Sequence, residues 1–401
     1  MDKKFYPTIG LEIHAELKTQ TKMFCGCLNP AGKSLTSNGA SNPEIKPNTL
    51  ICPVCMAHPG TLPVANKKAI ENVIKVGLAL DGEIADFTEF DRKNYFYPDI
   101  PKGFQISQYK YPIVSGGHLA DFDITRVHLE EDTANNKHIE GDPRHGGAGF
   151  SLIDFNRAGV PLMELVTEPK TFDASDEVVA KSAAKFAKEL QLILWYLGVS
   201  DANMEKGEMR VEANISISDA SPVDGLRPRD LKKLGLNQSE GLVGRTYGKY
   251  VLGTKVEVKN LNSFKSVEKA IKFELDRMLK LWQEGKQAEI VQETRGWDEN
   301  KQSTFSQRKK ESSHDYRYFP EPDLPKMFLH GGFSAKGGPA SGWDLEKMKS
   351  ELPELPEVRR NRYKTDFGIK DEDIESYIND FELGAWFEKV AEILKDKPAR
   401  S

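Results

Sequence analysis

The sequence carries a glutamate and a histidine two positions apart near its start, Glu12 and His14. From residue 9 to residue 17, apolar residues alternate with polar or small ones, which is the pattern of a β-strand with one buried face. Both side chains therefore leave the same face of the predicted strand. Carboxylate oxygens together with an imidazole suit Mg²⁺ or Mn²⁺. The alternative is ordinary surface charge on an exposed sheet face.

Three later segments bring further acidic residues that could join this face. They are His128-Leu-Glu-Glu-Asp132, the stretch Asp154–Glu168, and an alternating strand with Arg210, Glu212 and Asn214 on its polar side. Basic residues are interleaved with them: Arg92, Lys93, Arg157, Arg210, Lys259, Arg295, Arg308 and Arg317. A triphosphate needs this combination, because metal bridges its oxygens and guanidinium groups hold the transferred phosphoryl group. Taken singly, each basic residue could equally form a surface salt bridge.

Familiar nucleotide-binding loops are missing from the sequence. It contains no Gly-x-x-x-x-Gly-Lys-Ser/Thr loop and no Gly-x-Gly-x-x-Gly motif. Any ATP site must therefore be an open one, built from a sheet and its carboxylates instead of a helix N-terminus.

All four cysteines lie close together in the sequence, as the pairs Cys25/Cys27 and Cys52/Cys55. Two thiolates on each of two turns can complete a closed, tetrahedral zinc site. We predict a structural Zn²⁺ that pins an irregular loop over about residues 20–60. Four reduced, partly buried cysteines are the alternative.

The periodicity favours an α+β fold with a sheet rich in antiparallel pairs, because many short strands occur with few crossover helices. Helices are predicted over 64–80, over 174–197, and from Asn262 or Ser263 to about Gln283. Strand-like runs are predicted over 104–114, 122–131, 150–157, 161–166, 208–217 and 254–260. A Gly-rich linker follows at about 329–343, and the remainder is helical.

The bulk composition is that of an ordinary folded chain. The 401 residues are 38% hydrophobic and 29% charged, with a formal net charge of -5. That charge does not exclude a local basic surface that binds nucleic acid. We find no apolar run long enough to span a membrane and no leader at the N-terminus, and we expect a cytoplasmic protein.

Several motifs become specific when they are taken together. In chain order they are Ile9–His14, Phe90–Asp99, Gln105–Gln108, Arg126–Asp132, Asp154–Leu162, Val258–Ser263 and Asp315–Asp323, with Glu351–Pro356 further on. This set closely resembles the B subunit of the aspartyl/glutamyl-tRNA amidotransferases, from the N-terminus to about residue 325. The resemblance implies a cradle-shaped domain similar to the catalytic domain of glutamine synthetase, followed by a helical domain.

The resemblance also implies a reaction: a ligase forming a carbon–nitrogen bond, with glutamine as the amido donor. ATP phosphorylates the side-chain carboxylate of Glu-tRNA(Gln) or Asp-tRNA(Asn), and ammonia then displaces phosphate. The ammonia would come from the amidase (A) subunit, and a small (C) subunit would complete a heterotrimer.

The family's metal site would map to Glu12, His14, Glu130, Glu131 and Glu164; the direct ligand could be Glu130 or Glu131, which point to opposite faces of an ideal strand. Lys93 and Arg157 join Glu12 and His14 as predicted catalytic residues. We assign nucleotide binding to Arg92, Lys93, Asn156, Arg210, Lys259 and Arg317.

Domain boundaries follow from the same comparison. We expect a catalytic domain over 1–328 with an insertion at about 219–247, a linker over 329–343, and an incomplete helical domain over 344–401, without the family's C-terminal tail domain. Weak tRNA binding by the chain alone is therefore expected. Two alternatives remain: a non-catalytic tRNA-docking or scaffold protein, and the archaeal-type paralogue, the E subunit, whose added domain is longer than residues 219–247.

Overall fold

The structure is a computed structural model that describes residues 4–30, 45–139, 149–219, 245–247, 250–309, 316–330 and 342–395. Most of the predicted insertion at 219–247 and of the predicted linker at 329–343 lies outside these residues, as does the chain end at Ser401. The predicted division into domains stays a prediction.

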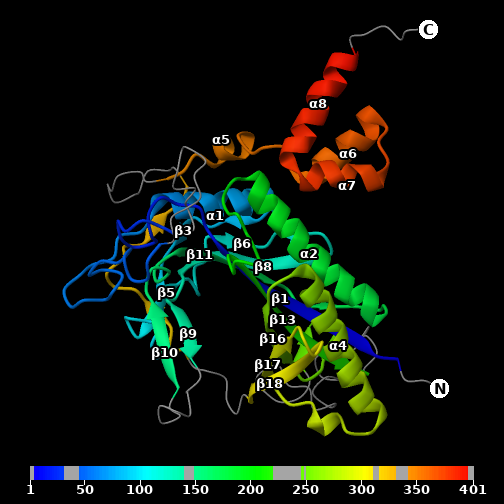
Figure 1. Ribbon diagram of the computed structural model, residues 1–401, viewed down its shortest axis with the longest axis horizontal. Coiled ribbons are helices and arrows are strands. Elements are labelled where there is room, and N and C mark those ends of the chain that lie inside the picture. The colour runs from blue at the N-terminus through cyan, green and yellow to red at the C-terminus, as the bar shows by residue number, and fades with distance from the viewer. Residues whose placement is uncertain are drawn as a thin grey trace.

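A large mixed sheet forms the centre of the molecule (Figure 1). It has 11 strands, and its main path runs β18-β17-β16-β13-β1-β11-β8-β6-β2. The strands of this sheet are β1 (Tyr6–Glu16), β2 (Glu83–Ile84), β6 (Val114–Ser115), β7 (His118–Leu119), β8 (Phe122–Glu131), β11 (Pro161–Thr167), β12 (Lys170–Thr171), β13 (Met209–Ser218), β16 (Val256–Leu261), β17 (Glu293–Asp298) and β18 (Ser303–Lys309). Among the described strands of this sheet, β16 and β17 alone pair in parallel, so the sheet is mainly antiparallel, as the sequence predicts.

The remaining described strands form short ladders outside this sheet. They are β3 (Phe87–Thr88) with β20 (Met327–Phe328), β4 (Asp91–Asn94) with β5 (Phe104–Ser107) and β19 (Phe319–Pro320), β9 (Asn135–Ile139) with β10 (Phe150–Asp154), and β14 (Arg245–Tyr247) with β15 (Tyr250–Leu252). The run predicted over 104–114 is thus two strands, β5 and β6, because Pro112 lacks the N–H group that a continuous ladder requires.

Three helices cover the apolar face of the sheet: α1 (Lys67–Ala79), α2 (Asp176–Tyr196) and α4 (Phe264–Gln283). Figure 1 shows α2 and α4 alongside β1 and β13. The alternate residues Ile9, Leu11 and Ile13 of β1 are buried in the same core as these helices. This leaves the polar face of β1, with Glu12 and His14, on the other side of the sheet.

Two of these helices begin at polar N-cap residues. Asn66 caps α1, accepting from the backbone N–H groups of Lys68 and Ala69, and Ser263 caps α4 through the N–H of Ser266. A short 3₁₀ turn, η2 (Gln287–Glu289), follows α4.

The C-terminal helices have a small core of their own. They are α5 (Leu345–Ser350), α6 (Pro356–Phe367), α7 (Asp371–Asn379) and α8 (Phe381–Lys395). Tyr363, Ile374 and Ile378 pack with Leu192 of α2, and Arg360 of α6 makes a two-pronged ion pair with Glu189. Figure 1 shows α6, α7 and α8 beyond one end of α2.

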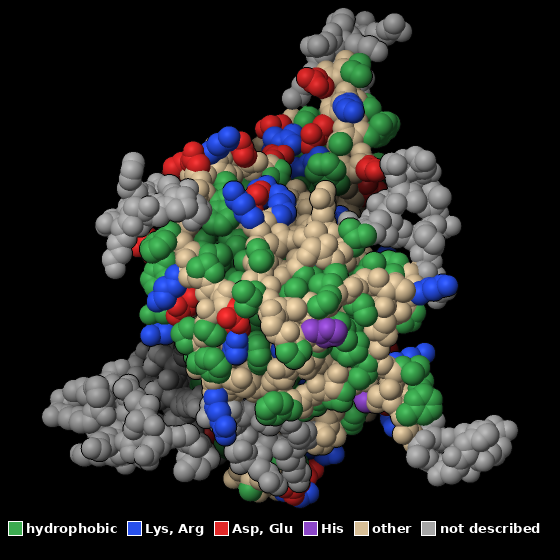
Figure 2. All heavy atoms as spheres, turned by 90° about the vertical axis from the view of Figure 1, so that its left-hand side faces the viewer, with side chains coloured by type: hydrophobic (Ala, Val, Ile, Leu, Met, Phe, Trp, Pro, Cys, Tyr) green, Lys and Arg blue, Asp and Glu red, His purple; other side chains and the backbone are tan. Residues whose placement is uncertain are grey.

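The surface carries exposed hydrophobic side chains in addition to charges. Leu62, Val64, Phe96 and Phe328 are each more than half exposed. Figure 2 shows hydrophobic side chains gathered in patches across one face. Among the described residues, no helix combines the length and apolar character needed to cross a membrane.

Candidate metal and phosphate site

The polar face of the sheet is assembled by the register of neighbouring strands. His14 on β1 lies opposite Glu164 on β11, and Glu12 lies opposite Glu212 on β13. Leu162 on β11 pairs with Glu130 on β8. Because directly paired residues of antiparallel strands share a face, side chains distant in sequence converge here.

One group of ligands consists of His14, Glu130 and Glu164, whose ligand atoms all lie within 4.8 Å of one another. His14 Nε2 is 3.5 Å from an oxygen of each carboxylate. Glu164 also contacts His128 Nε2 at 3.3 Å. An imidazole flanked by two carboxylates is a donor set that suits a divalent cation.

A second group lies beside it and consists of Glu12, Glu212 and Glu257, again within 4.8 Å of one another. Asn214 donates to Glu12 at 2.8 Å, and Lys259 donates to Glu212 at 2.6 Å. The predicted metal set is therefore divided: Glu12 belongs to a different trio from His14, Glu130 and Glu164.

The pKa values of two residues are shifted by the crowded negative charge on this face. Burial, together with the charges of Glu164 and Glu212, raises the pKa of Glu12. Burial opposes charge on His14, but the hydrogen bond to Glu164 and the charges of Glu164 and Glu130 outweigh it and raise the pKa of His14 to about 9. At neutral pH the metal-free His14 therefore carries a proton that a bound cation would displace.

Lys93, on β4, supplies positive charge to the first trio. Burial opposes its charge, but Glu130 and Glu164 outweigh it and raise the pKa of Lys93 above its usual range. Its ammonium group lies 5.2 Å from the ring centre of Tyr316, which contacts Tyr95 and Tyr318 edge to face. An aromatic wall therefore borders the lysine.

Asp132 contacts two arginines that the sequence predicts to be site residues, Arg157 and Arg210. Arg210 donates to Asp132 at 2.7 Å, and Arg157 lies 3.6 Å from the same oxygen. Arg157 also donates to the carbonyls of Thr133 and Ala134. Burial opposes the charge of Asp132, but the two arginines outweigh it and lower its pKa.

Several predicted residues lie away from the two trios. The carboxylate of Glu131 accepts from Lys102 and from the N–H of Ile106. Arg92 forms a two-pronged ion pair with Glu321. The side chain of Asn156 bonds the backbone of Lys46 and Leu50, so it holds the cysteine loop.

Arg317 is exposed and has a φ of 46°, and the side chain of Arg308 lies outside the described part of the chain. Arg295 on β17 forms ion pairs with Glu274 on α4 and with Glu293 on its own strand.

Three members of the polar face were not singled out as ligands from the sequence: His128, Glu212 and Glu257. The alternation Val256-Glu-Val-Lys259 could have indicated Glu257, which pairs with Asn214. His128 required the β8–β11 register, which pairs it with Glu164. Its Nδ1 is buried and has no hydrogen-bond partner among the described residues.

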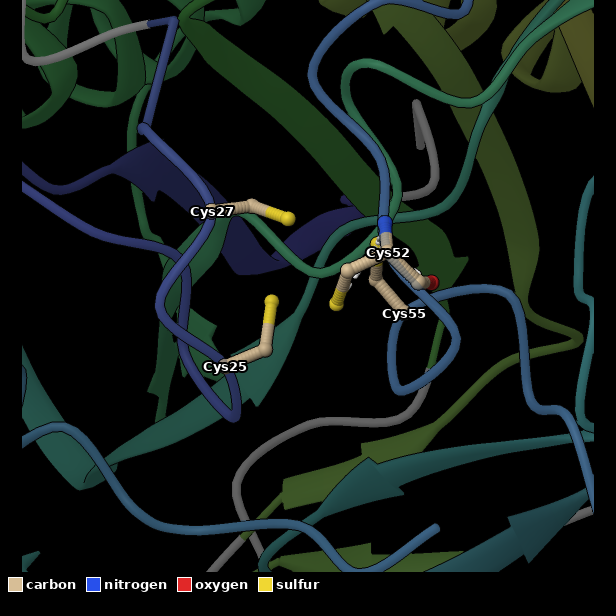
Figure 3. Close-up of side chains that lie close together, drawn as sticks. All are labelled: Cys25, Cys27, Cys52 and Cys55. Atoms are coloured by element: carbon tan, nitrogen blue, oxygen red, sulfur yellow. Dashed lines mark hydrogen bonds between the residues drawn. The ribbon is translucent and has the colours of Figure 1, made fainter.

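The four cysteines come together as predicted (Figure 3). Cys25, Cys27, Cys52 and Cys55 offer sulfur atoms within 4.8 Å of one another, and Cys55 is buried. The hydrogen bond with the Cys25 thiol lowers the pKa of Cys55 to about 4. Four sulfur donors so close together could hold a metal ion, and this donor set is compatible with structural zinc.

The fold and its site define a mixed α/β protein whose central sheet presents two acidic trios on one face, with a separate tetracysteine cluster. The chain belongs to the GatB/GatE catalytic domain family, whose sequence profile matches residues 7–334.

Similar proteins agree with this assignment. The chain is 40% identical over 398 residues to the B subunit of the aspartyl/glutamyl-tRNA(Asn/Gln) amidotransferase of Thermodesulfovibrio yellowstonii, covering 97% of this chain and 70% of that protein. It is 41% identical to the protein of the same name from Picosynechococcus, covering 95% of this chain and 68% of the relative. It is also 41% identical to the B subunit of the chloroplastic/mitochondrial glutamyl-tRNA(Gln) amidotransferase of Sorghum bicolor, covering 97% of this chain and 62% of the relative.

Proposed function

We propose that this chain is the carboxyl-activating component of a tRNA-dependent amidotransferase. In this proposal it uses ATP to convert Glu-tRNA(Gln), Asp-tRNA(Asn) or both to the corresponding amides, in the cytoplasm. The observation that carries the proposal is the pair of acidic trios on one open sheet face, in a chain of this family.

The reaction has two bond changes. An oxygen of the substrate carboxylate attacks the γ-phosphorus of ATP, so that an acyl phosphate forms and ADP leaves. The nitrogen of ammonia then attacks the acyl carbon, and phosphate leaves with the bonding electrons. The first step is needed because a carboxylate is a poor electrophile.

The residues of the polar face suit the first step. His14, Glu130 and Glu164 would hold one divalent cation, and Glu12, Glu212 and Glu257 a second, as in an open cradle of the glutamine synthetase kind. When bound, such cations would neutralise the negative charge of the triphosphate. Lys93, beside the first trio, would contact the transferred phosphoryl group. Arg157 and Arg210, both paired with Asp132, would add positive charge next to it.

Arg92, Asn156, Lys259 and Arg317 are weaker candidates for nucleotide contacts. The first three already bind protein groups, namely Glu321, the cysteine loop and Glu212. Their proposed contribution is to keep the walls of the site in place. Zn²⁺ in the tetracysteine cluster would have an architectural role, because all four coordination positions are filled by protein.

The partners in this proposal are the amidase (A) subunit, a small (C) subunit and the aminoacyl-tRNA. The relatives are named as B subunits, which supports a multi-subunit complex. The exposed side chains of Leu62, Val64, Phe96 and Phe328 offer apolar surface of the kind that protein interfaces use.

The test is ATP hydrolysis that depends on Glu-tRNA(Gln), and separately on Asp-tRNA(Asn), in the reconstituted complex. Glu12→Ala and His14→Ala should each lower turnover by about 100-fold or more, since each removes a ligand from one trio. His118→Ala, at an exposed position on β7, is the matched control and should retain wild-type turnover. Unchanged turnover in both active-site variants would favour the scaffold alternative, and activity with Glu-tRNA(Gln) alone would leave the archaeal-type E subunit as a rival.

A further inference from the structure

Lys22 is a fully buried lysine next to the tetracysteine cluster. Its exposed fraction is 0%, which is rare for a lysine because burial removes the ammonium group from water. Such a burial is tolerated only where the charge finds compensation inside the protein.

The ammonium group of Lys22 has two acceptors. Its Nζ lies 3.8 Å from Cys55 Sγ and donates to the carbonyl of Phe155 at 3.1 Å. Within the described part of the chain, no carboxylate forms an ion pair with it; the nearby Glu131 pairs with Lys102 instead. The charge of the ammonium group is therefore compensated by the sulfur cluster and by one carbonyl dipole.

Metal binding changes the charge of such a cluster in a definite direction. Four thiolates around one divalent cation carry a net charge of about -2, and the protons displaced from the thiols leave for solvent. A fixed positive charge beside the sulfurs then favours the loaded state over the metal-free state.

We propose that Lys22 is the internal counter-charge of the metal-loaded tetracysteine cluster and ties that cluster to the turn at residues 155–159. The inference rests on the proposed role of the cysteines as metal ligands. Lys22 is a positioning residue, since it acts on the metal through Cys55.

The backbone around Lys22 supports the second half of the proposal. The N–H of Lys22 donates to the carbonyl of Cys27, and the N–H of Met23 donates to the carbonyl of Gly159. A side chain at Gly159 would meet both Lys22 Cδ and Cys55 Cβ within 4 Å. Both cysteine pairs and the 155–159 turn thus meet at Lys22.

The turn at 155–159 leads to the polar face. Asn156 fastens it to the cysteine loop, and its neighbour Arg157 lies 3.6 Å from Asp132. Loss of the metal or of Lys22 should therefore loosen the segment that presents Arg157 to the site.

The first test measures zinc affinity of the full 401-residue chain by competition with a chromogenic chelator. Lys22→Met should weaken zinc binding by about 10- to 100-fold, the range for residues that support metal ligands. Lys22→Gln keeps a donor for Phe155 but removes the charge, and should weaken binding by about the same factor; it serves if the Met variant does not fold. Lys75→Gln, on α1 and paired with Glu71, is the matched control.

The second test is hydrogen exchange of residues 153–159 in the wild-type chain before and after zinc removal. We expect faster exchange in this segment after removal, and in the Lys22→Gln variant even with zinc present. Wild-type zinc affinity in Lys22→Gln would overturn the proposal. A wild-type chain that binds no zinc would instead contradict the metal role of the cysteines, so the two failures are distinguishable.

Discussion

Glu130 and Glu131 are neighbours on β8, but their carboxylates have different partners. Glu130 lies 3.5 Å from His14, whereas Glu131 bonds Lys102 and the N–H of Ile106. We expect Glu130→Gln to weaken Mn²⁺ binding by about tenfold or more, because it removes a charged ligand. Glu131→Gln should leave Mn²⁺ affinity unchanged. Paramagnetic resonance of bound Mn²⁺ measures both, and equal losses in the two variants would contradict the assignment.

His14 gives the site a pH dependence with a definite sign. Its pKa is raised to about 9 by Glu164 and Glu130, so at neutral pH the metal-free imidazole carries a proton that a cation must displace. Mn²⁺ affinity should therefore rise by up to about tenfold per unit between about pH 7 and 8.5. Titrations of the chain with Mn²⁺ at several pH values, under argon to prevent oxidation of the metal, measure this slope. Binding that is independent of pH, or a slope retained in His14→Ala, would contradict the role of His14.

Sequence spacing could predict some residues of this site but not others. Alternation alone puts Glu12 and His14 on one face of their strand, and it puts Arg210, Glu212 and Asn214 together on one face of a second strand. The division into two trios depends on strand register, which brings Glu257 and His128 into the site. Asn156 lies elsewhere because its amide satisfies backbone groups of a loop more than 100 positions away, a contact that no local pattern indicates.

At the scale of elements, the cap of α1 also fastens two segments together. Asn66 Oδ1 accepts from the N–H groups of Lys68 and Ala69, while its Nδ2 donates to the carbonyls of Thr21 and Lys22. Asn66→Ala should lower the free energy of unfolding by about 0.5–2 kcal/mol. Asn66→Asp keeps the acceptor and should lose less. Urea unfolding midpoints measure both, and an Asp variant as unstable as the Ala variant would show that the Nδ2 contacts dominate.

Long periodic segments were the most predictable elements. The helix predicted over 174–197 is α2, Asp176–Tyr196, and the strand predicted over 9–17 ends within one residue of the end of β1. Their periods of 3.6 and 2 are set by burial of one face, which the sequence records directly. The short ladders β3–β20 and β4–β19 join segments more than 200 residues apart, and their pairing depends on tertiary contacts.

At the scale of the whole molecule, the described residues form two separate buried cores that meet along α2. Leu190 belongs to the large core under the sheet, whereas Leu192 packs with Tyr363, Ile374 and Ile378 of the C-terminal helices. Positions two apart on a helix face different directions, so one helix serves both cores. The sequence predicted a helical C-terminal region, but it did not indicate that α2 supplies the contact.

Leu192→Ala and Leu190→Ala form a matched pair that tests this arrangement. Each should cost about 2–5 kcal/mol of packing, because each truncates a fully buried leucine. Leu192→Ala should speed amide hydrogen exchange in α6, α7 and α8 while β1 and β13 keep wild-type protection, since the large core is untouched. Leu190→Ala should instead speed exchange in the sheet. Exchange read by mass spectrometry distinguishes them, and the same pattern in both variants would mean that the two cores unfold as one cooperative unit.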